Sequence, residues 1–341
     1  MMRSPLQVAS FALAKLSLEI VTLLAIASPI CLLPFGQLPA IAQTAETRQA
    51  EADRLLQQGI EQFQISQVEA ALQSWQQALQ MYREIQDRLG EGNALGNLGL
   101  VYFALGNYDK AIDYQEQALT IAREIKNRRG EGNALGNLGL VYFSLGNYDK
   151  AVLYHEQSLA IKQKIKDRKG EGNSLGNLGL VYFALGNYGK AIEYHEKSLA
   201  IAREIKDRLR EGGALGNLGN AYDALGNYVR AIEYHEQSLA ISRKIKDRLG
   251  EGKSLGNLGS AYDALGNYDK AIEYHEQSLA IKREIKDRPG EGSALSGLGA
   301  AYDALGNYGK AIEYHEQALA IAREIKDRLG EGKSLGNLGR A

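Results

Sequence analysis

Apolar and polar positions follow a helical period inside a block of forty residues that returns along most of the chain. In the first clear copy, apolar residues spaced three and four apart mark one face of a helix: Leu95, Leu98, Val101, Tyr102 and Leu105. Gly106 and Asn107 interrupt this pattern. A second, longer helical series follows at Ala111, Ile112, Tyr114, Ala118, Leu119, Ile121 and Ile125. The block therefore predicts two antiparallel helices joined by a short turn.

Residues 127–132, which include Gly130 and Gly132, are expected to form the turn into the next block. The word Leu-Gly-Asn-Leu-Gly returns at Leu95, Leu135, Leu175, Leu215, Leu255 and Leu335. One supersecondary unit copied at a fixed period indicates a solenoid, in which each repeat packs on its neighbours rather than around a central core. The sequence thus predicts an all-α solenoid of helical hairpins.

The repeated positions resemble the tetratricopeptide repeat (TPR) signature, which they match at Leu95, Leu98, Gly99, Tyr102, Ala111 and Ala118. The words Asn-Leu-Gly-x-x-Tyr, Leu-Gly-Asn-Tyr and His-Glu-x-x-Leu-Ala-Ile resemble the forty-residue TPRs of the Pins/LGN adaptors and of their bacterial, cyanobacterial-like relatives associated with CHAT domains. The resemblance covers about residues 50–341, and it implies a right-handed TPR superhelix. The chain departs from the family at His195 and its equivalents, where the family has an aromatic residue.

The domain boundaries follow from where the period holds. We expect a signal peptide at 1–42, a short linker at 43–49, a degenerate first TPR acting as a cap at 50–91, six forty-residue units at 92–331, and a partial first helix at 332–341. The cap keeps Leu55, Gly59, Ala71, Trp75 and Ala78 at the core positions of the repeat. The last segment is a short stub, which suggests a naturally short or truncated gene product.

The N-terminal segment has the features of a secretory signal peptide. Basic residues Arg3 and Lys15 precede an apolar run over residues 20–36, and Ala40-Ile41-Ala42 offers a small-x-small cleavage site. The alternative is an uncleaved anchor, against which the run is short and interrupted by prolines. We expect a protein secreted across the inner membrane into the periplasm or outside the cell, with membrane contact only through an uncleaved signal segment.

Composition argues against several classes of function. Lys plus Arg number 40 and Asp plus Glu 41, so no basic surface for nucleic acid is expected. The only cysteine, Cys31, lies in the signal segment, and no nucleophile with a matching base stands outside a repeat position. We therefore predict a chain without catalytic residues and without cofactors.

Two repeated features resemble ligand sites without meeting their requirements. Five histidines recur forty residues apart: His155, His195, His235, His275 and His315. Stacked hairpins hold equivalent positions about 8–10 Å apart, too far for one zinc ion, so packing is the preferred interpretation and no metal is expected. Gly90-Glu91-Gly92 resembles a phosphate-binding loop, but no strand precedes it as such a loop requires. We therefore interpret these residues as part of a turn. Glu204–Arg208 and Glu284–Arg288 are interpreted as solvated pairs four residues apart on one helix.

Each first helix has a packed stripe and an opposite face. In a TPR superhelix the opposite face lines the concave surface, so it is the candidate binding groove. Its carboxamide series is Asn97, Asn137, Asn177, Asn217 and Asn257, preceded by Asn93, Asn133 and Asn173. A carboxamide both donates and accepts, which suits the backbone of an extended peptide, and these asparagines resemble the clamps of Pins/LGN adaptors and carboxylate-clamp TPRs. The alternative is a tolerated surface residue copied by duplication. Gly96 and its copies lie beside the series, where close approach of a neighbouring backbone or ligand would offset their helix-breaking cost.

The groove changes character along the chain. Its N-terminal half presents Leu100, Leu140 and Leu180 with Phe103, Phe143 and Phe183. Its C-terminal half presents Asp223, Asp263 and Asp303, and Lys253. The hypothesis is a ligand with an apolar portion toward the first half and a basic portion near the aspartates.

These features predict a secreted, non-catalytic TPR scaffold that binds a peptide or protein segment in its concave groove. One alternative is a structural array that self-associates through its weakly capped C-terminal end. The other is the sensor or adaptor part of a CHAT-type protease system that acts with a separate partner.

Overall fold

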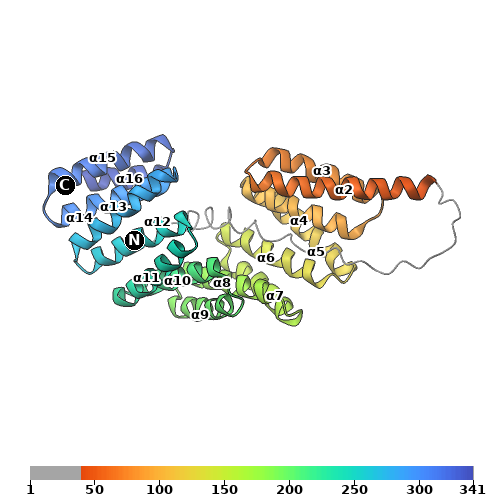
Figure 1. Cartoon of the computed structure of the whole chain (residues 1–341), viewed down its shortest axis with the longest axis horizontal. Helices are drawn as coiled ribbons and strands as arrows, with labels where there is room; N and C mark the ends of the chain where they lie inside the picture. The colour runs from red at the N-terminus through yellow and green to blue at the C-terminus, as the bar shows by residue number, and fades with distance from the viewer. Residues whose placement is uncertain (1–39, 341) are drawn as a thin grey trace. The chain divides into compact units, whose positions relative to one another are not determined.

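The computed structural model describes residues 40–340, with side chains from residue 46 onward. This range contains fifteen α-helices and no strand (Figure 1). The helices are Ala40–Gln64 (α2), Val68–Glu84 (α3), Arg88–Ala104 (α4), Tyr108–Glu124 (α5), Arg128–Ser144 (α6), Tyr148–Lys164 (α7), Arg168–Ala184 (α8), Tyr188–Glu204 (α9), Arg208–Ala224 (α10), Tyr228–Lys244 (α11), Arg248–Ala264 (α12), Tyr268–Glu284 (α13), Arg288–Ala304 (α14), Tyr308–Glu324 (α15) and Arg328–Leu338 (α16). The predicted all-helical solenoid is confirmed.

The chain divides into two compact units, one ending at Asn177 and one beginning at Leu178, so the division falls within α8. In the first unit α2 packs against α3, α4 against α5 and α6 against α7, and α3 and α5 also pack against α4 and α6, the first helices of the following pairs. The second unit repeats this arrangement from α9 to α16 (Figure 1). Each hairpin thus contacts its nearest neighbours in the chain, as a solenoid requires.

From α4/α5 onward the turn inside each hairpin is closed by glycine, whereas Ser66, with φ of 62°, takes this place between α2 and α3. Gly106 has φ of 74°, and the backbone N–H of Asn107 donates to the Tyr102 carbonyl at 2.8 Å. The Asn107 side chain then accepts from the backbone N–H of Lys110 and caps α5. This combination of a left-handed residue and a side-chain cap ends one helix and starts the next within three residues.

The turn between hairpins is shorter than the sequence predicted. Lys126, with φ of 56°, and Asn127, which caps α6, complete the connection, and α6 begins at Arg128. Gly130 and Gly132 therefore lie inside α6, and their assignment to a turn was wrong. The same correction applies to Gly90-Glu91-Gly92, which forms the first turns of α4. Side-chain capping by Asn or Asp outweighs the low helix propensity of these glycines.

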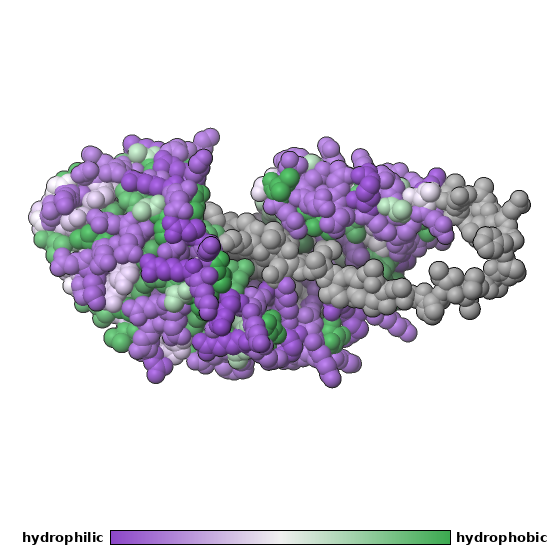
Figure 2. Space-filling model, viewed as in Figure 1, coloured by the Kyte–Doolittle hydropathy of each residue, from purple (hydrophilic) through white to green (hydrophobic). Residues whose placement is uncertain are grey.

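The helical faces predicted to pack are largely buried, except at the helix ends, where Leu105 and Ile125 are exposed. Leu95 and Leu98 are fully buried, and Tyr102 is nearly so, whereas Leu105 caps the end of α4 and is 47% exposed. Hydrophilic residues dominate the outer face seen in Figure 2, with smaller hydrophobic patches between them. The core is therefore a thin layer of apolar side chains between successive helices, and every hairpin contributes its own part of that layer.

The first hairpin, α2 with α3, keeps its core despite its divergent sequence. Leu55, Ala71 and Ala78 are buried, and Trp75 is 2% exposed. The Trp75 ring lies against the backbone of Gly59, and its Nε1 donates to the Leu56 carbonyl at 2.9 Å. Tryptophan here fills the space that smaller residues share in later hairpins, and a glycine opposite makes the room.

The element boundaries differ from those expected at both ends of the repeat. Each first helix begins four residues earlier than position 92 and its equivalents, and α2 begins at Ala40 and so includes residues 43–49, where a linker was expected. The predicted signal segment, residues 1–42, falls outside the described residues except for the backbone of 40–42. Within residues 40–340 no helix combines the length and apolar character needed to cross a bilayer.

The predicted Glu–Arg pairs on one helix are wrong, because a turn separates their members. Glu284 is the last residue of α13, and Arg288 is the first of α14. Glu284 instead accepts from Arg248, 36 residues earlier, with 2.9 Å between Nε and Oε1. Glu204 and Arg208 are likewise divided between α9 and α10.

Candidate functional site

The asparagines predicted to line a groove all lie on first helices, in the same register. Asn97, Asn137 and Asn177 belong to the first unit, Asn217 and Asn257 to the second, and all five are half-buried. One turn earlier, Asn93 is exposed and Asn133 and Asn173 are half-buried. Each unit thus carries a row of carboxamides on successive first helices, which α14 interrupts with Gly297.

Three of these asparagines, Asn137, Asn257 and Asn133, form side-chain hydrogen bonds inside the protein. Asn137 Nδ2 donates to Gln115 Oε1 on the preceding second helix at 3.3 Å, and Asn257 Nδ2 donates to Asn220 Oδ1 on the preceding first helix at 3.0 Å. The Asn133 carboxamide oxygen accepts from the Lys162 ammonium. The asparagine row therefore runs along the seam between successive hairpins, which helical geometry within one hairpin could not reveal.

The glycines beside the asparagine row face space rather than a neighbouring backbone. A Cβ atom on Gly96 would meet no atom within 4 Å, and one on Gly136 would meet only the Ser158 hydroxyl at 3.3 Å. The close approach lies three residues later, where a Cβ on Gly99 would lie 2.4 Å from Gln115 Nε2. Helix packing therefore explains Gly99, the second glycine of the repeated Leu-Gly-Asn-Leu-Gly word. It does not explain Gly96, the first.

The predicted apolar half of the groove is only partly available at the surface. Phe103 packs against Tyr108 with ring centroids 5.7 Å apart, and Phe143 packs in the same way against Tyr148 and is buried. In the second unit Phe183 and Tyr188 repeat the contact at 5.3 Å. The phenylalanines fill the interface within each hairpin, while Leu100, Leu140 and Leu180 are half-buried.

The aspartates of the second unit occupy the register that phenylalanine holds earlier. Asp223, Asp263 and Asp303 are half-buried. Asp263 Oδ1 is buried without a hydrogen-bond partner, and burial raises the pKa of this carboxyl group. Lys253, one turn from the start of α12, is exposed. The Asp263 carboxylate would gain from a cation brought by a ligand, since burying a charged oxygen without a hydrogen-bond partner is costly.

The five histidines lie on second helices and are buried against glycine. A Cβ on Gly139 would lie 2.6 Å from His155 Cε1, and Gly219 and His235 repeat this contact at 2.4 Å. Burial lowers the pKa of His155 to about 3 and that of His235 to about 4. No three His, Cys, Asp or Glu side chains converge on a metal position in the part of the chain that the structure describes. Neutral, packed imidazoles therefore account for the histidine repeat.

The sequence analysis missed a stack of two tyrosines and a cation in each of the six hairpins from α4/α5 to α14/α15. Tyr102 and Tyr114 stack with centroids 5.3 Å apart, and Lys110 Nζ lies 4.8 Å from the Tyr102 ring centroid. The same stack recurs around Tyr142, Tyr182, Tyr222, Tyr262 and Tyr302. The constant spacing of eight residues from tyrosine to cation was the available signal.

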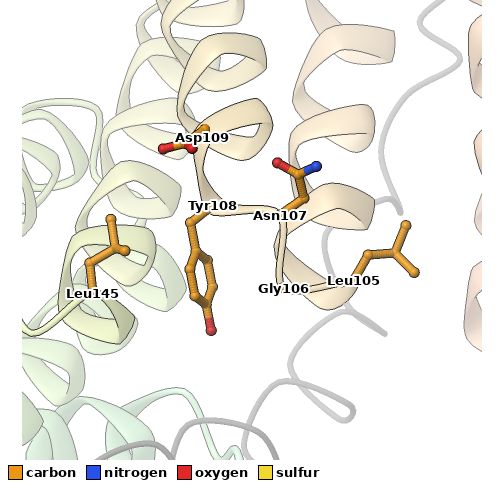
Figure 3. Close-up of a pocket in the computed structure, with 6 residues that line it drawn as sticks. All are labelled: Leu105, Gly106, Asn107, Tyr108, Asp109 and Leu145. Carbon is orange, nitrogen blue, oxygen red and sulfur yellow. The ribbon is translucent and has the colours of Figure 1, made fainter.

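One surface depression lies between successive hairpin turns of the first unit (Figure 3). It has a volume of about 360 Å³ and is lined by Leu105, Gly106, Asn107, Tyr108, Asp109 and Leu145. Figure 3 shows Tyr108 between the Leu105 and Leu145 side chains. None of the predicted groove residues lines this depression, so it is a feature of the turn edge.

Comparison with known proteins assigns the repeat. The family model for the tetratricopeptide repeat matches seven overlapping segments: 62–124, 90–164, 130–204, 170–244, 210–284, 250–324 and 290–341. A search of curated protein sequences gave no significant match.

Solved structures resemble this chain in fold at low sequence identity. The apo form of RapI superposes with a TM-score of 0.66 at 18% identity, covering 81% of this chain and 99% of RapI. Aspartyl phosphate phosphatase F from Bacillus subtilis gives 0.66 at 17% identity, covering 85% of this chain and 74% of that one. A Rap protein complexed with Competence and Sporulation Factor gives 0.57 at 15%, covering 88% and 97%.

Proposed function

This chain belongs to the tetratricopeptide repeat family, and from that premise we propose that it is a non-catalytic scaffold whose first helices bind a peptide or protein segment. The observation that carries the proposal is the row of half-buried carboxamides beside glycines whose outer side meets no backbone. An extended backbone laid along the row of one unit would exchange hydrogen bonds with Asn97, Asn137 and Asn177 in the first unit, or with Asn217 and Asn257 in the second. The solved complex of a Rap protein with Competence and Sporulation Factor supports the use of this fold for such binding.

The ligand we propose has an apolar portion and a basic portion. Leu100, Leu140 and Leu180 supply half-buried apolar contacts, and the unpaired oxygen of Asp263 marks where a cation lowers the cost of burial. Replacing Asp223, Asp263 and Asp303 by asparagine should weaken binding more at low than at high salt, because screening reduces charge pairing. Equal affinities of parent and variant across salt would remove the basic portion from the proposal.

The proposed location is the periplasm or the outside of the cell, on the strength of the predicted signal segment. Mass spectrometry of the protein recovered from a periplasmic extract tests this through its N-terminus, which should begin near Gln43. Recovery of the intact Met1 from the cytoplasm would contradict it. A role as the sensor or adaptor of a CHAT-type protease system remains a variant of this proposal that requires a separate protease partner.

A pull-down with paired variants tests the groove. Residues 43–341 serve as bait, against a variant in which Asn97, Asn137, Asn177 and Asn217 are alanine. The matched control changes Gln157 and Gln237, exposed carboxamides on second helices, to alanine. A protein captured by the parent and the control but lost by the asparagine variant supports the groove, provided that the melting temperatures agree. Capture that is unaffected by the asparagine changes overturns it.

Self-association is the second candidate. On α16 Leu335 is 47% exposed, whereas its counterpart Leu295 is 1% exposed. An apolar residue so exposed can pack against another copy. Light scattering across a range of protein concentrations decides: a mass that rises with concentration, and that returns to the monomer with Leu335→Glu, favours a structural array.

A further inference from the structure

In the first helices from α4 to α16 a glutamate near the start of the helix is held by two arginines, except in α8, where Glu171 accepts from Gln163 and Arg168. Glu91 on α4 is 7% exposed, and its two oxygens accept from Arg83 on α3 at 2.8 Å and from Arg88 on α4 at 2.5 Å. Glu251 and Glu291 repeat this arrangement in the second unit. The arginine at the first position of each first helix is therefore fixed in place by an ion pair with one edge of its guanidinium group.

The other edge of the same guanidinium group takes a second carboxylate in three hairpins. Arg88 pairs with Glu124, the last residue of α5. Arg248 donates to Glu284 at 2.9 Å through Nε, and Arg288 donates to Glu324 at 3.0 Å. These hairpins show which ligand this position accepts: a carboxylate, bound in the fork of a fixed arginine.

Two hairpins place a lysine where this second carboxylate belongs. In α6/α7 the first-helix residue is Arg128, which holds Glu131, and the last residue of α7 is Lys164. In α10/α11 the same positions carry Arg208, which holds Glu211, and Lys244. The repeat thus brings two cations to the position where the other hairpins bind a carboxylate between the helices.

The surroundings of Lys164 add further positive charge. The two turns that flank α6 and α7, residues 123–131 and 162–171, contain nine basic and four acidic residues. The equivalent turns of the last hairpins contain seven basic and six acidic residues, in 282–291 and 322–331. Lys162 is the exception, because it is buried and paired with Asp167 at 3.2 Å; burial lowers the pKa of its ammonium group, and Asp167 opposes this. The outer end of the α6/α7 hairpin is therefore a concentrated cationic patch on a nearly neutral protein.

We propose that Arg128 and Lys164 form a binding site for carboxylate side chains of an acidic polypeptide segment, and that Arg208 and Lys244 form a second one. An incoming glutamate or aspartate takes the place that Glu124 holds beside Arg88. A carboxylate is favoured over a phosphate or a lipid surface because the sister hairpins bind carboxylate at this arginine. The site lies about 13 Å along α6 from Asn137, so it is separate from the proposed groove.

Fluorescence anisotropy with a labelled decaglutamate peptide tests the site at low salt, with decaglutamine as the uncharged control. The variant K164E/K244E restores the carboxylate that the sister hairpins carry and should weaken decaglutamate binding about tenfold or more, without lowering the melting temperature. K164Q/K244Q should fall between the parent and the reversed variant. The change Glu284→Lys, which opens a third site at Arg248, should strengthen binding.

Two outcomes overturn the proposal. If K164E/K244E binds decaglutamate as tightly as the parent, Arg128 and Lys164 do not form the site. If decaglutamate fails to bind while phosphatidylglycerol vesicles or inorganic phosphate bind in a manner sensitive to K164E/K244E, the ligand is not an acidic polypeptide. Because K164E/K244E leaves every asparagine of the groove in place, failure here is distinguishable from failure of the proposed function.

Discussion

At the residue scale, two glycines three positions apart in each first helix have opposite surroundings. A methyl group on Gly96 would meet nothing within 4 Å, whereas one on Gly99 would press into the Gln115 side chain at 2.4 Å. Gly96→Ala should raise the free energy of unfolding by about 1 kcal/mol through helix propensity. Gly99→Ala should lower it by about 1–3 kcal/mol through overpacking. Urea unfolding followed by circular dichroism measures both, and equal shifts in one direction would contradict this account.

The Gly96→Ala variant also tests whether a ligand uses the space beside Gly96. If a ligand backbone approaches Gly96, then Gly96→Ala should weaken capture of the partner while it stabilises the protein. A variant that is more stable and binds normally would show that the space over Gly96 is not used.

The left-handed residues of the two turns differ in kind. Lys246 adopts φ of 58° between α11 and α12, whereas Gly266 adopts φ of 76° between α12 and α13. A left-handed conformation costs a residue with a Cβ roughly 1–2 kcal/mol, and glycine avoids most of this cost. Lys246→Gly should therefore stabilise the protein by a few tenths to about 1 kcal/mol, and Gly266→Ala should destabilise it. Thermal melts decide, and a loss of stability in Lys246→Gly would indicate that this lysine makes a contact worth more than its strain.

At the scale of packed elements, the buried histidines make stability depend on pH. Burial holds the pKa of His155 near 3, against 6.5 when exposed. Below pH 6.5 the unfolded chain therefore binds a proton that the folded chain excludes, so stability falls as pH drops from 6.5 toward 3. Each such histidine contributes a slope of about 1.4 kcal/mol per pH unit within that window.

The first clear hairpin offers a natural substitute, because Gln115 occupies the histidine position there. His155→Gln should flatten the loss of stability between pH 6 and pH 4 by the slope of one histidine. Urea unfolding at several pH values measures this, with Gln157→Ala as an exposed control on the same helix. Parallel curves for parent and variant would mean that His155 is accessible to protons in the folded state.

Helices and their packed faces could be predicted because they depend on spacing within one repeat. Leu95, Leu98 and Ala111 are buried as the period requires. Boundaries were harder: Gly130 and Gly132 indicated a turn, but capping by Asn127 begins α6 before them. Contacts between helices, such as Asn137 with Gln115 in successive hairpins and Glu284 with Arg248 within one hairpin, join positions 22 and 36 residues apart and follow from the packing of the helices alone.

At the scale of the whole molecule, every hairpin within a unit presents similar surfaces to its neighbours. Deleting residues 248–287 joins Asp247 to Arg288, which keeps an aspartate at the N-cap position and preserves the order of first and second helices. The shortened protein should fold with unchanged helicity per residue and a slightly lower melting temperature, because one interface is lost. Deleting only 248–267 makes two second helices follow each other and should disrupt folding. Equal behaviour of the two deletions would argue against a modular array.

The lone tryptophan gives this repetitive protein an optical asymmetry. Trp75 is enclosed in the first hairpin, while stacked tyrosines are distributed over the six hairpins that follow. Indole emission, excited near 295 nm, thus reports from one end of the array, and tyrosine absorbance reports from the rest. A denaturation experiment that records both signals shows whether the first hairpin unfolds before or after the others, and it needs no added label.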